Sequence, residues 1–152
     1  MGSDIMKSMK VKHIDHIGIN VNDLPAAKAF FMELGFALVG EAQTKGEFLD
    51  SVIGLKGAET DFVMLEAPGG QLRLEVIKYL KPDDPERDRV PDANNLGLGH
   101  IAFEVDNLEE IVARIKEKGY KLIGEIRTYQ DSWKLCYVRG PGNIIVELAE
   151  RH

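Results

Sequence analysis

The sequence predicts an α+β protein built from two tandem βαβββ modules, and two observations carry this prediction. Residues 16–41 align without a gap to residues 100–125, with ten of the 26 positions identical. Each copy also reads as one strand, a capped amphipathic helix and three further strands. A repeat of this kind indicates one supersecondary unit used twice, whose two incomplete sheets complete each other.

The first module is expected to cover residues 11–79. It opens with a strand over residues 11–21, whose alternation places apolar side chains on one face and His16 and Asn20 on the other. A helix follows, because Asn22-Asp23 supplies an N-cap and apolar residues then recur at helical spacing up to a glycine. Three strand candidates complete the module, at residues 37–42, 60–66 and 71–79, with an ambiguous apolar segment at residues 48–55.

A charged, proline-bearing stretch without periodicity, residues 80–97, joins the modules as a linker or lid. The second module, residues 98–150, opens with a strand that faces His100 away from its apolar neighbours. Asp106 and Asn107 are expected to cap its helix. Three strand candidates follow, at residues 121–127, 134–139 and 143–148.

Composition restricts the classes of function. With 152 residues, 44% of them hydrophobic, the chain is expected to form one domain over residues 1–152, since each half alone would be marginal. A net charge of −6 argues against a nucleic-acid partner. We expect a cytoplasmic protein without a membrane partner, because no signal peptide or bilayer-length apolar run is present. The single Cys136 allows no internal disulfide and fits a reducing compartment.

Four residues at equivalent places of the repeat form the candidate site. His16 and His100 open the modules, and Glu75 and Glu147 lie between apolar residues in the strands that close them. An ionised carboxylate in an apolar strand costs several kcal/mol unless a cation or donor meets it, although a wet polar face would also accept it. We interpret the two imidazoles and two carboxylates as ligands of one divalent metal, Ni²⁺, Co²⁺, Mn²⁺, Fe²⁺ or Zn²⁺ rather than Ca²⁺.

These motifs resemble the vicinal oxygen chelate superfamily, also called glyoxalase/bleomycin resistance/dioxygenase proteins. The resemblance runs from HIDHIGINVNDL to GNIIVELAE and includes GHIAFEV at the start of the second module. It implies a cupped mixed β-sheet with helices on the outer face, and a homodimer. It also implies that His16, Glu75, His100 and Glu147 hold the metal. The ligand order is similar to that of bacterial glyoxalase I, which favours Ni²⁺ or Co²⁺ over Zn²⁺, Mn²⁺ or Fe²⁺.

The activity that this resemblance implies is a metal-dependent lyase or isomerase, in which a proton moves at a metal-bound enediolate. Glu147 is the expected base and Glu75 its partner on the opposite side. A glyoxalase I-like enzyme, of the lactoylglutathione lyase type, would act on a hemithioacetal. An enzyme similar to methylmalonyl-CoA epimerase would act on an acyl thioester, although those enzymes generally carry glutamine where this chain has Glu75.

Substrate contacts are predicted at Asn20, Arg73 and Trp133. Asn20 stands where glyoxalase I enzymes typically place an arginine. Arg73 shares a strand face with Glu75 and can take the place of that missing arginine. Arg87 and Arg89 in the linker are further pocket candidates.

Two other classes stay open. An extradiol dioxygenase would hold iron with three ligands, His16, His100 and Glu147, and leave Glu75 as an extra charge. A non-catalytic drug-binding protein of the bleomycin-resistance type would need no ligand set at all.

Overall fold

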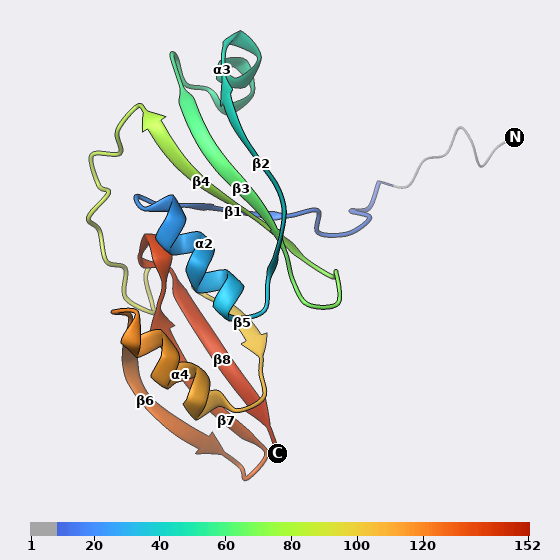
Figure 1. The fold of residues 1–152 in the computed structure, drawn as a ribbon, viewed down its shortest axis with the longest axis vertical. Coiled ribbons are helices and arrows are strands. Elements are labelled where there is room, and N and C mark those ends of the chain that lie inside the picture. The colour runs from blue at the N-terminus through green and yellow to red at the C-terminus, as the bar shows by residue number, and fades with distance from the viewer. Residues whose placement is uncertain (1–8) are drawn as a thin grey trace, which may run out of the picture.

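The computed structural model describes residues 9–152, so residues 1–8 of the predicted domain lie outside the described part. The elements of the first module are β1 (Ile17–Asn20), α2 (Leu24–Glu33), β2 (Ala37–Lys45), α3 (Glu47–Ile53), β3 (Glu59–Glu66) and β4 (Arg73–Lys81) (Figure 1). Those of the second are β5 (Ile101–Glu104), α4 (Leu108–Glu117), β6 (Lys121–Tyr129), β7 (Trp133–Arg139), the 3₁₀ helix η1 (Pro141–Asn143) and β8 (Ile145–Arg151). Apart from α3 and η1, both modules follow the predicted order.

Each module forms its own four-stranded mixed sheet. The strand order is β1-β4-β3-β2 in the first sheet and β5-β8-β7-β6 in the second, with the first strand parallel to the last in each. The two registers are equivalent, because Gly18 lies opposite Glu75 and Ala102 lies opposite Glu147. The α+β prediction is confirmed, and within one chain the strands are divided between two sheets.

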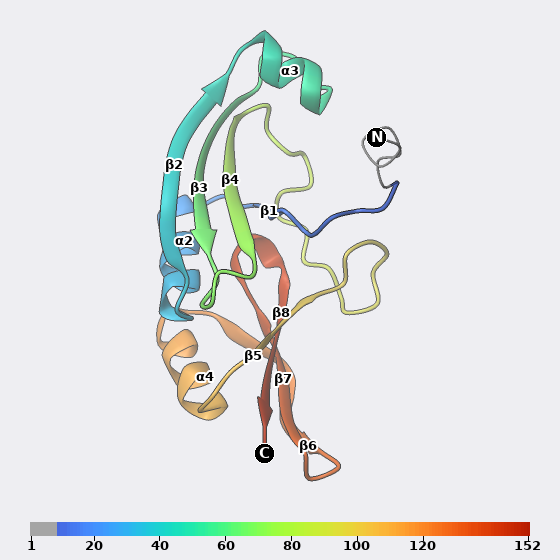
Figure 2. The ribbon, with the colours of Figure 1, turned by 90° about the vertical axis from the view of Figure 1, so that its right-hand side faces the viewer.

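Helices α2 and α4 lie side by side and cover one face of the two sheets (Figures 1 and 2). The rings of Phe30 and Tyr120, from different modules, meet edge to face with their centroids 4.8 Å apart. Phe36 and Phe103 make a second such contact at 5.4 Å. One hydrophobic cluster therefore runs through both modules. The helices contribute to it the buried residues Ala27, Phe30, Phe31, Leu108, Val112 and Ile115.

The two helices are capped differently. Asp23 Oδ1 accepts the Ala26 N–H at 3.0 Å, as predicted. Asn107 occupies the N-cap position of α4 but makes no cap bond with its side chain. Its φ of 56° is left-handed, whereas a capping side chain requires an extended backbone. The Leu108 N–H instead donates to Glu150 Oε1 at 2.7 Å, so the predicted side-chain cap of α4 is wrong.

Both opening strands are shorter than predicted. Pairing begins at Ile17 in β1 and Ile101 in β5, so His16 and His100 stand immediately before their strands instead of inside them. The ambiguous segment at residues 48–55 is mostly the helix α3, which has no buried residue.

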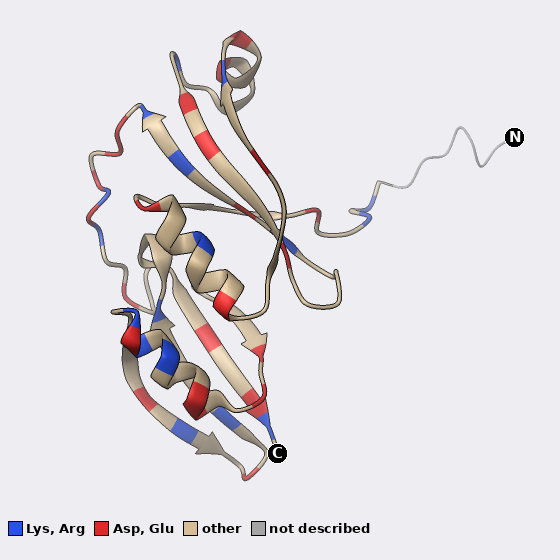
Figure 3. Cartoon of the chain, viewed as in Figure 1, with Lys and Arg blue, Asp and Glu red and all other residues tan. Residues whose placement is uncertain are grey.

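The linker is tied to the second module. Arg139 Nη1 donates to the Pro91 carbonyl at 2.6 Å, and Asn143 Nδ2 donates to the Arg89 carbonyl at 2.9 Å. The segment carries both signs of charge and runs on the side away from the helices (Figures 2 and 3). These bonds favour a fixed wall over a freely opening lid. In residues 9–152, no helix has the length and apolarity needed to cross a bilayer.

Candidate functional site

The structure brings the four candidate residues together as two pairs. His16 Nε2 lies 3.9 Å from Glu75 Oε2, and His100 Nε2 lies 3.3 Å from Glu147 Oε1. The construction is the same in both modules. Each histidine precedes an edge strand, and each glutamate lies on the neighbouring parallel strand, opposite the second residue after the histidine. The strand register thus makes the pairs.

The side chains of both pairs are half-buried. Their exposed fractions are 39% and 40% for His16 and His100, and 25% and 20% for Glu75 and Glu147. The strand neighbours of both glutamates are fully buried in the core, as with Leu74. Both carboxylates therefore point away from the helices, as the alternation predicted. They keep part of their hydration and stay open to a ligand or ion.

The two pairs do not form one group within the chain. Among the described residues, no three His, Cys, Asp or Glu side chains are placed to hold one metal ion. Cys136 is buried, and burial raises the pKa of its thiol to about 11, which makes it a poor ligand at neutral pH. One chain thus presents two separate half-sites.

Each pair fits two ligands of the same ion. Ligand atoms at about 2.1 Å from an ion are about 3.0 Å apart at a right angle and about 3.4 Å apart at a tetrahedral angle. The 3.3 Å of the second pair lies within this range. The 3.9 Å of the first pair requires a small side-chain movement, which its partial exposure permits.

The other ring nitrogen of each histidine also has a partner. His16 Nδ1 lies 2.7 Å from Asp15 Oδ2, and this hydrogen bond lowers the pKa of Asp15. His100 Nδ1 lies 3.4 Å from the Tyr137 hydroxyl. Sequence reasoning did not identify these two contacts. Asp15 adjoins the histidine in the sequence, whereas Tyr137 is found only through the register that places it opposite Glu147.

A cavity of about 710 Å³ lies between β1, the linker, the start of β5 and the η1 turn. Its volume is in the range of small-molecule pockets. Asn20, one of the predicted substrate contacts, lines it, and so do His100, Arg87 and Arg89. The cavity therefore adjoins the second half-site.

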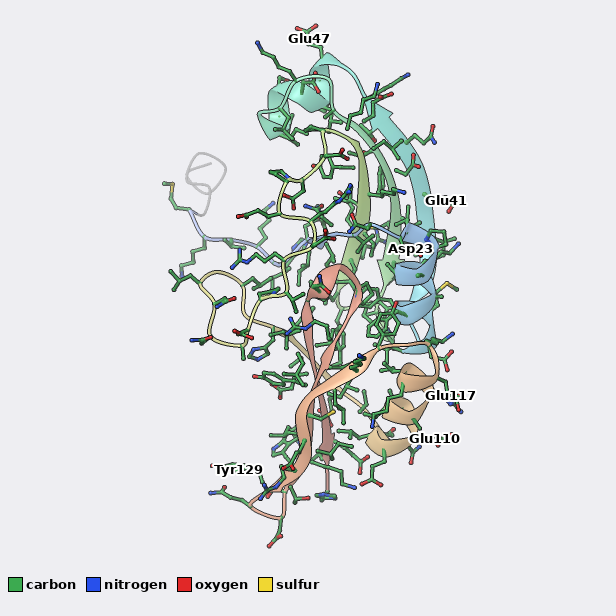
Figure 4. All side chains as sticks on the ribbon, turned by 90° about the vertical axis from the view of Figure 1, so that its left-hand side faces the viewer. Asp23, Glu41, Glu47, Glu110, Glu117 and Tyr129 are labelled. Carbon is green, nitrogen blue, oxygen red and sulfur yellow. The ribbon has the colours of Figure 1, made fainter. Side chains whose placement is uncertain are left out.

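The other two predicted substrate contacts lie outside this cavity. Arg73 Nε is 3.4 Å from Glu66 Oε1, so its guanidinium is engaged on the neighbouring strand. The Arg151 guanidinium covers the Trp133 ring at 4.5 Å. Trp133 begins β7, at the end of the second module where Tyr129 points outward (Figure 4).

Comparison with known proteins gives consistent results. The family model described as Glyoxalase/Bleomycin resistance protein/Dioxygenase superfamily matches residues 15–137. The mitochondrial methylmalonyl-CoA epimerase of Bos taurus is 30% identical over 140 residues, 90% of this chain and 73% of that protein. A crystal structure of a glyoxalase family protein from Bacillus cereus is 34% identical with a TM-score of 0.89, covering 96% of this chain and 98% of that one.

A more distant structure is that of a variant of the fosfomycin resistance protein FosX from Listeria monocytogenes, complexed with Mn(II) and dihydroxypropylphosphonic acid. It is 18% identical with a TM-score of 0.58, and the match covers 91% of this chain and 90% of that one. At this identity the likeness concerns the fold alone.

Proposed function

Because the chain belongs to the glyoxalase/bleomycin resistance protein/dioxygenase superfamily, we propose that it is a metal-dependent enzyme that moves a proton at a carbon next to a carbonyl group. The family membership confirms the resemblance seen in the sequence. The observation that carries the proposal is the occurrence of two equivalent His–Glu half-sites, each with an imidazole nitrogen facing a carboxylate.

We assign one divalent metal ion to His16, Glu75, His100 and Glu147. Bound there, it would stabilise the negative charge that develops on a substrate oxygen. Proteins of this superfamily commonly bind a divalent metal, and the Mn(II) of the FosX complex is an example. Ni²⁺ and Co²⁺ stay our first choices, with Zn²⁺, Mn²⁺ and Fe²⁺ as alternatives.

The two carboxylates carry the proton. Glu147 takes it from the substrate carbon. Glu75, in the other half-site, exchanges a proton on the opposite side of the substrate. Return of the proton to the neighbouring carbon isomerises a hemithioacetal, and return to the same carbon from the other side epimerises an acyl thioester. The cavity beside His100 receives the rest of the substrate, with Asn20, Arg87 and Arg89 on its walls.

The two substrate classes have different support. Glu75 and the ligand order favour the glyoxalase I-like lyase. The 30% identity to a methylmalonyl-CoA epimerase, and the neutral Asn20 where an arginine would clamp a substrate carboxylate, favour an acyl-thioester epimerase.

The test is a substrate panel on protein reconstituted separately with Ni²⁺, Co²⁺, Mn²⁺ and Zn²⁺. Methylglyoxal with several thiols is compared with short branched acyl-CoA esters in D₂O, followed by NMR. Net conversion of a hemithioacetal identifies the lyase, and solvent deuterium at the α-carbon of a thioester identifies the epimerase. Ring cleavage of catechols with oxygen uptake under Fe²⁺, or metal-free protein without turnover on either class, would contradict the proposal.

We further propose that a homodimer completes the site, with the first half-site of one chain facing the second half-site of another. Exposed apolar side chains support this, because most of them come from residues 9–14, from α3 with the turn after it (residues 47–55) and from the linker. These three segments project from the side opposite α2 and α4 (Figure 2). They and the end of β4 expose Met9, Val11, Ile14, Phe48, Val52, Leu55, Leu80, Val90, Leu96 and Leu98.

Complementation tests the shared site. One variant carries His16→Ala and Glu75→Gln, and the other carries His100→Ala and Glu147→Gln. If the site is shared, a refolded equimolar mixture contains heterodimers with one intact site and regains roughly a quarter of wild-type activity. A site within one chain would leave the mixture as inactive as each variant alone. A mixture of wild type with either variant controls for refolding yield.

A further inference from the structure

The two candidate ligand histidines are held by different groups at their second ring nitrogen. Asp15 Oδ2 lies 2.7 Å from His16 Nδ1, a short distance typical of a charge-assisted hydrogen bond. The Tyr137 hydroxyl lies 3.4 Å from His100 Nδ1, and the two rings are tilted with centroids 5.1 Å apart. The repeat does not share these devices. Gly99 stands at the position equivalent to Asp15, and Met64 opposes Glu75 as Tyr137 opposes Glu147.

The chemistry of each partner decides what the imidazole presents to its glutamate. An ionised carboxylate only accepts hydrogen bonds, so Asp15 requires the proton of neutral His16 on Nδ1. Nε2 is then a bare lone pair, and it is the atom that faces Glu75. A phenol hydroxyl both donates and accepts, so Tyr137 is compatible with either tautomer of His100. Its 3.4 Å contact is also at the long end for a hydrogen bond.

We propose that Asp15 is a positioning residue that fixes the tautomer and orientation of His16, whereas Tyr137 helps to orient the His100 ring without selecting its tautomer. The first half-site is therefore preorganised for a cation by a carboxylate, and the second by a tyrosine. The part of this inference that concerns metal affinity rests on the proposed function. Partners of this kind typically change metal affinity by about 10- to 100-fold when removed.

The tautomer is measured on metal-free protein. Long-range ¹H–¹⁵N NMR at about pH 9, where free imidazole is neutral, reports which ring nitrogen carries the proton. We expect the proton of His16 on Nδ1 in the wild type, its transfer mainly to Nε2 in Asp15→Ala, and its return to Nδ1 in Asp15→Glu. Asp88→Asn, an acidic linker residue outside the cavity lining, is the matched control. A wild-type His16 protonated on Nε2, or an unchanged tautomer in Asp15→Ala, would overturn the assignment.

Metal binding is measured separately by calorimetry with Co²⁺ and by the visible spectrum of the Co²⁺ protein. Asp15→Ala should weaken binding about 10- to 100-fold and Asp15→Glu should recover part of the loss. Tyr137→Phe should weaken it less than about tenfold, and Tyr129→Phe should have no effect. Equal affinities for Asp15→Ala and the wild type would refute the role of Asp15 in metal binding. A wild type that binds no metal but shows the expected tautomers refutes the proposed function and supports the positioning role.

Discussion

In the first module, β2 and β3 are joined by the helix α3, whereas in the second, β6 and β7 are joined by a tight turn at residues 130–132. Their helices are capped by different strategies, and their histidines are held by a carboxylate and by a phenol. The strand registers and the His–Glu pairs nevertheless agree position by position. The comparison shows that strand pairing places the candidate ligands, while the groups that support them differ between the halves.

The largest functional difference between the modules is expected in the loss of kcat when either glutamate is substituted. Glu147→Gln should lower kcat about 100- to 10,000-fold, because it removes the proposed base. Glu75→Gln should lower kcat less, because its carboxylate acts on the opposite side of the substrate from the proposed base. Steady-state kinetics on the better substrate, with metal content measured for each variant, provides the comparison. Glu125→Gln on β6 is the control, and a larger loss in Glu75→Gln would exchange the two roles.

The stability of the shared core is expected to depend strongly on Phe30 of α2 and little on the equivalent position of α4. Phe30 is fully buried against Tyr120, whereas the equivalent position of the second module is Arg114, an exposed residue whose ion pairs with Glu110 and Glu33 lie at the surface. Phe30→Ala should lower the free energy of unfolding by about 3–5 kcal/mol. Arg114→Ala should change it by less than about 1 kcal/mol. Urea unfolding measures both, and similar losses would contradict a core that joins the modules through α2.

The buried thiol of Cys136, in the second module, should make the stability of the protein depend on pH. Cys136 occupies the position of Val63 in the first module, and burial raises the pKa of its thiol to about 11. Between about pH 9 and that value, the folded protein keeps a proton that the unfolded chain loses, so the stability contributed by Cys136 falls as pH rises. Comparing unfolding at about pH 8 and about pH 10.5 should show a loss on the order of 2 kcal/mol that Cys136→Val lacks. An equal loss in the variant would assign the slope to other groups.

The smallest effects concern the helix caps. Asp23→Ala and Glu150→Ala should each destabilise the protein by about 1 kcal/mol, because each leaves a helix N–H without its partner. Asn107→Gly should change stability by less than about 0.5 kcal/mol, since Asn107 makes no cap bond and glycine accepts its left-handed backbone. Thermal unfolding of the three variants tests the difference. A loss in Asn107→Gly as large as in Asp23→Ala would restore the symmetrical caps that the sequence suggests.

The repeat alone predicted the α+β class, the order of elements apart from α3 and η1, and the equivalent places of the two histidines and the two glutamates. These features depend on hydrophobic periodicity and on strand alternation, and both are local patterns of side chains. The same patterns placed Asn20, which lines the cavity, but they also nominated Arg73 and Trp133. The local pattern could not show that Arg73 forms an ion pair with Glu66, or that the Arg151 guanidinium covers the Trp133 ring.

The tertiary structure alone decided the contacts between residues that lie far apart in the chain. Glu150 caps a helix 42 residues before it, Tyr137 reaches His100 across the one strand β8, and Arg139 ties the linker to the second module. The division of the strands into two sheets, which leaves the four candidate residues as two half-sites, is also of this kind. Such contacts depend on how the modules pack and on strand register. The energy of any one of them is too small, and too dependent on geometry, to be written in a local sequence pattern.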